Sequence, residues 1–456
     1  MKSRMVESVA FGLTKEFRDR FQQALDERDN TFIKQNLEGV NAADITALLY
    51  EFNSEESKYV LDLLEVEIRA EIITDLDSDA RVVFLKTYQP DELIKIIDHL
   101  DSDDAADILN ELPIKVREEV LAGLDKVLRS QVIDLLRYDE NVAGGLMAKE
   151  LITARVSWTV VQSIEEIRKQ VENVSKFYAV YVVDDFNKLL GRVPLQKLIL
   201  TDSSTLVKDI YDPEVISVET HLEDTEVASV MRKYDLETVP VVNVYGQLVG
   251  RITIDDVVDV ITEQAEEERQ LMSGISEDVE EDDSIWRLTR ARLPWLIIGI
   301  VGGLISVQFI GIFEGDLMRI TAIAFFIPLI QATGGNVGIQ SSSIVVQSLA
   351  NPGFVQEGLW GRLAKVFVVA ILNGLLLALI VLAANMLLGG ESSKLFVVVS
   401  IALFAVVLAA SLIGTVTPLV LNKFGFNPAL ASGPFITTIN DLLGLGIYFL
   451  TIHLVL

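Results

Sequence analysis

The sequence predicts a multi-domain membrane protein in which an all-α helical-repeat domain, a tandem pair of α/β domains and a connecting helix precede a transmembrane domain of five helices. Three observations lead to this prediction: a short repeat near the N-terminus, a longer repeat in the middle of the chain, and five long apolar stretches near the C-terminus. The 456 residues exceed the roughly 150 expected of one domain. Charge divides the chain in the same way, because residues 1–290 carry a net charge of −29 and the remainder carries +1.

Residues 1–142 are expected to form the acidic helical-repeat domain. The turn Leu76-Asp77-Ser78-Asp79 recurs as Leu100-Asp101-Ser102-Asp103, and Leu124-Asp125 follows at the same interval of 24 residues. Asp and Ser are good N-cap residues, and the Ile and Leu residues between the turns run at helical spacing. The region therefore predicts a small stack of helical hairpins.

Residues 143–265 contain the longer repeat. The run Val180–Asp184 is echoed by Val239–Asn243 at an offset of 59 residues, and Gly191-Arg192 is echoed by Gly250-Arg251. Each copy reads as a helix, an apolar β-run, a turn with Asp or Asn, a second β-run and a further helix. Over roughly 147–265 the chain resembles a tandem pair of CBS domains, a module that usually acts as a regulatory sensor.

Residues 266–290 are expected to form a connecting helix that leads into the transmembrane domain, residues 291–456. The stretch from Val257 to Trp286 is rich in Asp and Glu. A run of this kind is commonly a solvated connector. Its position against the first apolar stretch leaves a functional role open.

Five apolar stretches approach the ~20 residues that are needed to cross a bilayer. They cover about 293–313, 319–346, 363–388, 395–421 and 429–455. Arg and Lys residues are more frequent in the connections on one side, and residues 1–290 lack an export signal. We therefore expect a protein of the cell inner membrane whose spans contact membrane lipid. The positive-inside rule places its N-terminus in the cytoplasm and its C-terminus on the opposite side of the membrane.

Composition excludes several classes of function. The chain has no cysteine and only three histidines, so disulfides, thiolate sites and a histidine-rich transition-metal site are not expected. A net charge of −28 disfavours nucleic acid as a partner. The sequence shows no nucleophile-and-base pair and no Walker or GxGxxG loop, so we do not expect an enzyme.

The second apolar stretch contains the polar segment Pro328–Ser342. Its proline and three glycines weaken a helix, and its Thr, Asn, Gln and Ser side chains supply oxygen atoms that lipid could not satisfy. Close helix packing through small residues is the alternative explanation. Asn336 and Gln340 lie one helical turn apart on the same face, which favours a polar pathway.

Asp441 is the only acidic residue well inside any of the five stretches. Burying an unpaired carboxylate at this depth costs at least ~2.5 kcal/mol, so an aqueous site is expected. No basic residue lies deep in a stretch, which makes a cation the natural partner. Mg²⁺ prefers oxygen ligands and retains water, and a twofold dimer would bring two Asp441 side chains to one ion.

The domain order, the junction Ala143–Met147 and the motifs TGGNVGIQSS and TINDLLG together resemble the MgtE family of magnesium channels over essentially the whole chain. The resemblance implies a homodimer with the pore between subunits, where Asp441 binds hydrated Mg²⁺. The two membrane motifs supply the residues expected to line the pore: Gly334, Gly335, Asn336, Gln340, Thr437, Thr438 and Asn440.

The resemblance also implies regulatory Mg²⁺ sites between the cytoplasmic domains and the connecting "plug" helix. The positions that match are Glu71, Asp103, Asp107, Asp235, Asp256, Asp259 and Glu268. Asn427 departs from the family pattern, where an aspartate helps to tie the plug to the pore, and Gly433 replaces an asparagine near the pore.

ATP binding, which is known in some relatives, is expected to be weak or absent. The second CBS copy retains Thr253 and Asp256, whereas the first has Pro194 and Lys197 at the matching positions.

The membrane motifs and the family resemblance together predict a magnesium channel that is closed by cytosolic Mg²⁺. The alternative is a membrane-anchored CBS sensor without transport activity.

Overall fold

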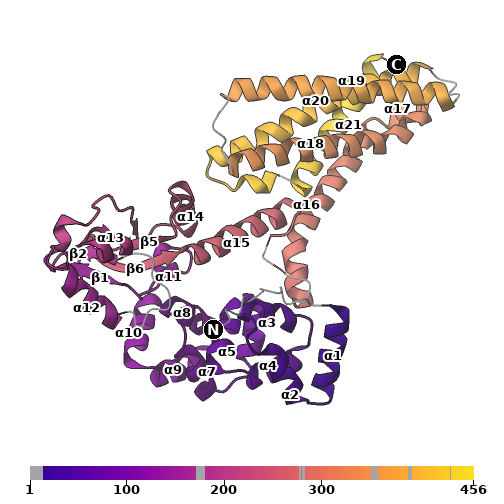
Figure 1. Cartoon of the computed structure of the whole chain (residues 1–456). Coiled ribbons are helices and arrows are strands. Elements are labelled where there is room, and N and C mark those ends of the chain that lie inside the picture. Colours follow the sequence, from indigo (N-terminus) through magenta and orange to yellow (C-terminus); the bar gives the residue numbers. More distant parts are fainter. Residues whose placement is uncertain are drawn as a thin grey trace. The chain divides into compact units, whose positions relative to one another are not determined.

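The computed structural model of the chain describes residues 14–170, 180–276, 279, 283–350, 358–388, 393–431 and 433–455. The chain divides into two compact units, Met1–Ile261 and Thr262–Leu456. Figure 1 shows the elements of both units along the sequence. The predicted classes of structure are confirmed, because the first unit holds a helical stack and two small sheets, and the second holds five helices long and apolar enough to cross a membrane.

The first unit begins with a stack of short helices joined by tight turns. Asp77, Asp101 and Asp125 occupy the N-cap positions that the 24-residue interval predicts. Only at Asp125 does the structure show a side-chain cap, in which Oδ2 accepts a hydrogen bond from the Val127 amide at 2.8 Å. The helices are α1 (Lys15–Asp26), α2 (Asn30–Leu37), α3 (Ala42–Leu49), α4 (Ser54–Leu63), α5 (Val66–Asp75), α6 (Ser78–Leu85), α7 (Pro90–Ile97), α8 (Ser102–Glu111), α9 (Ile114–Gly123) and α10 (Lys126–Leu135).

Two three-stranded sheets follow, one in each copy of the longer repeat. In each sheet the middle strand pairs in parallel with the strand before it and antiparallel with the strand after it. The first copy contains α11 (Ala143–Leu146), β1 (Thr153–Arg155), α12 (Val160–Gln170), β2 (Val180–Val183), β3 (Leu189–Val193), α13 (Leu195–Leu200) and η2 (Val207–Asp209). The second contains β4 (Val218–Glu219), α14 (Asp224–Lys233), β5 (Thr238–Val242), β6 (Leu248–Thr253) and the start of α15 (Ile254–Met272).

The turn between the two antiparallel strands is built in the same way in both copies. Asp184 Oδ1 accepts hydrogen bonds from the amides of Phe186 and Lys188, at 2.8 and 2.9 Å. Asn243 Oδ1 repeats this arrangement in the second copy. The Asp/Asn-containing turn read from the sequence therefore has a physical cause, since these short side chains bond readily to the backbone that follows them.

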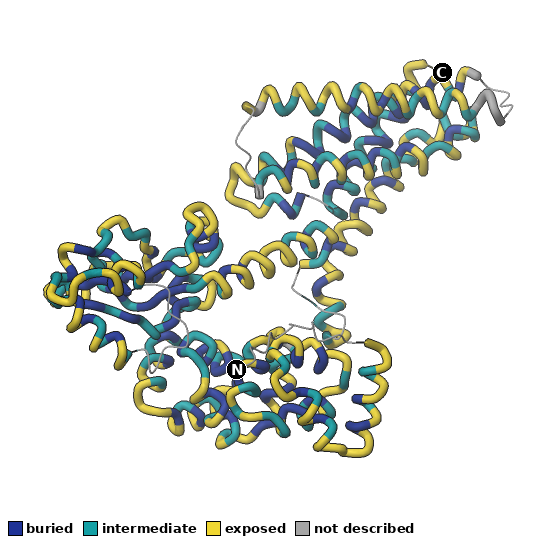
Figure 2. Tube along the Cα trace, viewed as in Figure 1, coloured by how far each residue is buried: buried dark blue, intermediate teal, exposed yellow. Residues whose placement is uncertain are grey.

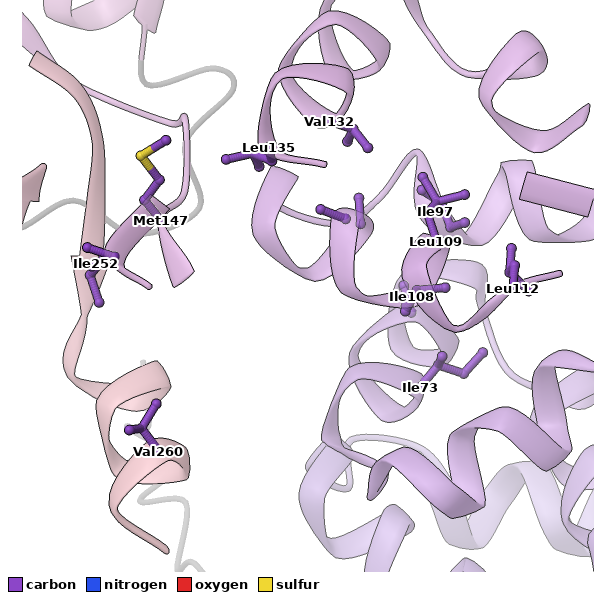
Figure 3. Close-up of a cluster of buried hydrophobic side chains, with 14 of the residues drawn as sticks. Ile73, Ile97, Ile108, Leu109, Leu112, Val132, Leu135, Met147, Ile252 and Val260 are labelled. Carbon is purple, nitrogen blue, oxygen red and sulfur yellow. The ribbon is translucent and has the colours of Figure 1, made fainter. Parts of the chain in front are cut away.

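One hydrophobic core joins the helical stack to the second CBS copy (Figure 3). Ile97, Leu109 and Val132 come from the stack, while Ile252 and Val260 come from β6 and the start of α15. All five side chains are buried. This shared core fixes α8 and the start of α15 within one unit, which matters for the acidic side chains that both helices carry.

The second unit contains the membrane helices. Buried positions are sparse on α16, which Figure 2 shows as exposed along most of its length, as expected for a helix that faces lipid or another subunit. The elements of the second unit from residue 285 onward are α16 (Ile285–Ile312), α17 (Glu314–Arg319), η3 (Thr321–Phe326), α18 (Ile327–Ala350), α19 (Leu359–Leu388), α20 (Ser393–Lys423), η4 (Pro428–Ala431) and α21 (Pro434–Val455).

The helix α18 is continuous through the polar segment, although its proline and glycines are unfavourable in a helix interior. Pro328 is its second residue, where a missing amide hydrogen costs nothing because the first turn has no acceptor for it. The glycines are compensated by close packing, described below. A break does occur before α21, where η4 ends at Ala431 and Gly433 has a positive φ of 58°.

Candidate functional site: a membrane carboxylate and an acidic cluster

The polar motifs of α18 and α21 pack directly on each other. A Cβ atom built on Gly335 would lie 3.5 Å from Thr437 Cγ2 and 3.8 Å from Asp441 Oδ1, and one built on Gly338 would collide with the Asn440 amide. The glycines of α18 therefore allow α21 to approach closely. Close packing, which the sequence left open as the alternative, explains the glycines.

Asp441 lies half-buried against α18. In the part of the chain that the structure describes, no cationic side chain forms an ion pair with it. One turn earlier, the Thr437 hydroxyl donates to the Pro434 carbonyl at 2.9 Å, and the Thr438 hydroxyl donates to the same carbonyl at 2.8 Å. Both hydroxyl oxygens keep lone pairs that can accept a hydrogen bond from a hydrated cation.

The amide side chains of the two motifs fall into different environments. Asn336 and Gln340 are exposed together on one side of α18, as their spacing predicts. Asn440 is fully buried, and both atoms of its amide lack a hydrogen-bond partner among the described residues. Asn440 was expected to line the pore, but in this structure it does not reach the surface of the chain.

The end of α15 docks at the break before α21. Leu271 is buried in a small cluster with Val346 of α18 and Ala429 of η4. A Cβ atom on Gly433 would lie 2.7 Å from the Met272 carbonyl oxygen, so only glycine fits this approach. Asn427 instead caps η4, since its Oδ1 accepts a hydrogen bond from the Ala429 amide at 2.9 Å.

The structure brings most of the expected regulatory carboxylates into one acidic cluster, within the first unit. It consists of Asp103, Asp104 and Asp107 on α8 together with Asp256 and Asp259 at the start of α15. Burial and the neighbouring charge of Asp256 raise the pKa of Asp103 well above its usual value of 3.8. Burial is also the main cause that raises the pKa of Asp104 and Asp107 to about 7 and of Asp256 to about 6.

These raised pKa values have a single physical meaning. Several carboxylates are held near one another with too little water and too few cations to stabilise their charges. A divalent cation would relieve this repulsion, because Mg²⁺ prefers carboxylate oxygens. Among the residues the structure describes, no three Asp, Glu or His side chains already stand close enough to hold a metal ion.

Two cluster neighbours were not expected from the sequence. Asp104 interacts with Asp256, and Glu150, which accepts a hydrogen bond from Ser102, adds to the negative charge near Asp103. Asp104 stands beside Asp103 in the sequence, so the adjacent pair was a visible signal. Glu150 gave none, because its approach depends on the packing of the segment after α11.

The three remaining expected regulatory residues are not among the charges that shift the pKa values of the cluster. Glu71 is exposed on α5, and Asp235 is exposed in the turn after α14 with a positive φ of 50°. Glu268 lies on the later part of α15 within the second unit, where burial and Glu267 raise its pKa.

A small pocket lies between the two CBS copies. The buried Arg192 Nε atom in its wall has no hydrogen-bond partner in the described structure. Thr253 and Asp256 are not among the residues that line this pocket, and the Thr253 hydroxyl donates a hydrogen bond to Asp256 Oδ2 at 2.9 Å. The pocket is lined by Tyr181, Arg192, Glu214, Val215, Ile216, Leu236, Thr238 and Pro240.

Comparisons with known proteins agree with this arrangement. Family models match a divalent cation transporter domain (MgtE) over residues 327–451, an MgtE intracellular N domain over 40–141 and a CBS domain over 207–263. The magnesium transporter MgtE of Thermus thermophilus is 34% identical over 447 residues, covering 95% of this chain and 97% of the relative. That of Bacillus subtilis is 29% identical and covers 89% and 90%.

A solved structure is similar to about half of this chain. It is the cytosolic domain of the Mg²⁺ channel MgtE in complex with ATP, with a TM-score of 0.50 and 35% sequence identity, covering 53% of this chain and 99% of that one. The length of the match to the curated relatives and the order of the matched domains leave one assignment. The chain belongs to the MgtE family of divalent cation transporters.

Proposed function

We propose that this protein is a homodimeric magnesium channel that carries Mg²⁺ into the cell and closes when cytosolic Mg²⁺ is high. The single observation that carries the proposal is Asp441, a carboxylate within a membrane helix that has no cationic partner among the described residues. A carboxylate at this depth requires a compensating cation or water. The names of the relatives support Mg²⁺ as that cation.

The dimer is supported by the exposed side of α18. Asn336 and Gln340 lie on the surface of the chain within a helix that is long and apolar enough to cross a membrane. Lipid offers no hydrogen bonds to such amides. A second copy related by a twofold axis would cover them, and it would place two Asp441 carboxylates around one hydrated ion.

Regulation is proposed to begin at the acidic cluster. Mg²⁺ bound there would replace the repulsion among carboxylates by attraction and favour a compact cytoplasmic region. The docking of Leu271 and Met272 at the start of α21 supports a route from α15 to the helix that carries Asp441. Glu71, Asp235 and Glu268 remain candidates for further regulatory sites, outside the cluster.

The domain limits and orientation belong to the same proposal. We keep the helical-repeat domain at 1–142, the CBS pair at 143–265, the plug at 266–290 and the transmembrane domain at 291–456. The plug continues the helix α15, which runs unbroken through residue 265. The N-terminus is placed in the cytoplasm and the C-terminus outside the inner membrane.

Adenine nucleotide is expected to bind weakly or not at all in the pocket between the CBS copies. The relative's ATP complex and the unpartnered Arg192 Nε support binding of an anionic ligand. Pro194 and Lys197 oppose it, because they replace the hydroxyl and carboxylate that hold a ribose. Calorimetry with ATP measures the balance, and tight binding would make the CBS pair a nucleotide sensor as well.

Ion flux through the purified protein in liposomes tests the main proposal. We expect Mg²⁺ uptake that follows an imposed membrane potential and that stops when millimolar Mg²⁺ is present on the cytoplasmic side. The membrane-anchored sensor, which membership of a transporter family disfavours, would show no flux. Flux that millimolar cytoplasmic Mg²⁺ leaves unchanged would retain the channel and remove its regulation.

A further inference from the structure

A partly buried ion pair lies at the end of the acidic cluster. The Arg81 guanidinium of α6 donates to both carboxylate oxygens of Glu111, with Nε 3.0 Å from each and Nη2 2.7 Å from Oε1. Its Nη1 also donates to the Thr74 carbonyl at 3.2 Å, and the Ser78 hydroxyl donates to Glu111. The Arg81 and Glu111 side chains are only 16% and 14% exposed.

This pair is continuous with the cluster along α8. Asp104, Asp107 and Glu111 are spaced three and four residues apart, so they share one face of the helix. Arg81 also interacts electrostatically with Asp104, Asp107 and Asp259. A fixed positive charge is therefore held beside the carboxylates that are proposed to bind Mg²⁺.

An ion pair of this kind does not necessarily stabilise the folded protein. Replacing buried pairs by apolar residues is often neutral or stabilising, so burial alone is weak evidence of a structural role. The guanidinium group cannot lose its proton in a protein, and the bidentate contact fixes its position. Because of these two properties, Arg81 is a permanent positive charge at a fixed position. A Mg²⁺ ion that enters the cluster is repelled by this charge.

We propose that Arg81 is a tethered counter-ion that sets the Mg²⁺ concentration at which the acidic cluster fills. This inference rests on the proposed function of the cluster as a Mg²⁺ sensor. Arg81 holds α6 against α8 when the cluster is empty and weakens Mg²⁺ binding by its charge. It raises the threshold for closure, so the channel stays open until cytosolic Mg²⁺ is high.

The test compares four variants of the full-length protein, using the Mg²⁺ midpoint of protection from limited proteolysis and of flux closure. Arg81→Gln makes the cluster more negative by one charge, and we expect its midpoint to fall roughly three- to tenfold. Glu111→Gln makes it less negative, and its midpoint should rise. Arg81→Lys and the double variant R81Q/E111Q preserve the net charge, so their midpoints should stay near that of the wild type.

The opposite directions of the two single variants are decisive. Both break the same ion pair, so a purely structural role for Arg81 predicts that both midpoints rise, which would overturn the proposal. Arg18 and Glu51 form a matched Arg–Glu pair elsewhere in the stack, 2.7 Å apart, and their Gln variants should leave the midpoint unchanged. A wild type without any Mg²⁺-dependent protection would instead reject the sensor itself.

Discussion

Asp441 is the residue that we propose contacts the transported ion. Asp441→Asn keeps the size of the side chain and removes its charge, so the fold of α21 should survive while transport fails. A unit charge about 4 Å from a divalent ion contributes about 2 kcal/mol even in water. We therefore expect Mg²⁺ flux in liposomes to fall at least about thirtyfold, with the dimer unchanged by size-exclusion chromatography.

The control for this prediction is Glu314→Gln on α17. Glu314 is exposed and lies outside the five long apolar helices, so its neutralisation should leave flux intact. Wild-type flux through the Asp441→Asn variant would show that the pathway does not run past this carboxylate.

Asp441 and Asn440 are neighbours in the sequence, but only the environment of Asp441 could be predicted from it. Asp441 was recognisable because a lone acidic residue in an apolar stretch is unusual whatever the tertiary structure. Asn440, its neighbour, was expected at the pore surface, whereas it is fully buried within the chain. Asn440 is buried because its side-chain amide packs against Gly338, which has no Cβ atom. The sequence of α21 alone does not show that α18 approaches so closely.

The junction between α15 and α21 is where we expect that the proposed regulation can be interrupted while Asp441 is left unchanged. Gly433 has a φ of 58°, and a Cβ there would crowd the Met272 carbonyl. Gly433→Ala should therefore loosen the docking of α15. Loss of about 1 kcal/mol or more corresponds to about a fivefold or larger increase in the cytoplasmic Mg²⁺ needed to stop flux in liposomes.

Gly425→Ala provides a matched control for the backbone. Gly425 also has a positive φ, 77°, but nothing lies within 4 Å of an added Cβ. Both variants carry the cost of alanine in a left-handed conformation, about 1–2 kcal/mol. Equal Mg²⁺ dependence in the two would mean that contact with Met272 plays no part in closure.

The boundaries of elements were predictable where local chemistry fixes them. The 24-residue interval located the N-caps of α6, α8 and α10, and the turn residues Asp184 and Asn243 located both hairpins. The continuity of α18 was not predictable, since glycine is unfavourable in an isolated helix. Packing against α21 compensates for that cost, and packing is a property of two elements.

The acidic cluster is formed by tertiary packing, which brings together residues from distant parts of the sequence. Asp107 and Asp256 lie far apart in the sequence, and one shared core places their helices in the same unit. The sequence indicated which carboxylates to consider through a family resemblance. It could not indicate that Glu71 and Asp235 are exposed in this structure, because exposure depends on how the helices and sheets of the first unit pack.

The raised pKa values of the cluster predict how pH acts on the cytoplasmic region without Mg²⁺. When the carboxylates are separated, their pKa values are near 3.8, whereas in the compact form those of Asp104 and Asp107 are about 7 and that of Asp256 is about 6. The compact form binds more protons between these limits. Its stability is fully present below about pH 4 and is lost as pH rises through about 6 to 7.

Mg²⁺ should abolish this dependence, because it supplies the positive charge that protons supply at low pH. In limited proteolysis of the full-length protein without Mg²⁺, we expect stronger protection at about pH 6 than at about pH 8, and equal protection at both in millimolar Mg²⁺. Asp104→Asn/Asp107→Asn should stay protected at both pH values without Mg²⁺. The exposed pair Glu118→Gln/Glu119→Gln on α9 loses the same charge and should behave as the wild type. Protection that increases with pH in the absence of Mg²⁺ would contradict the assignment of these carboxylates to a repulsive cluster.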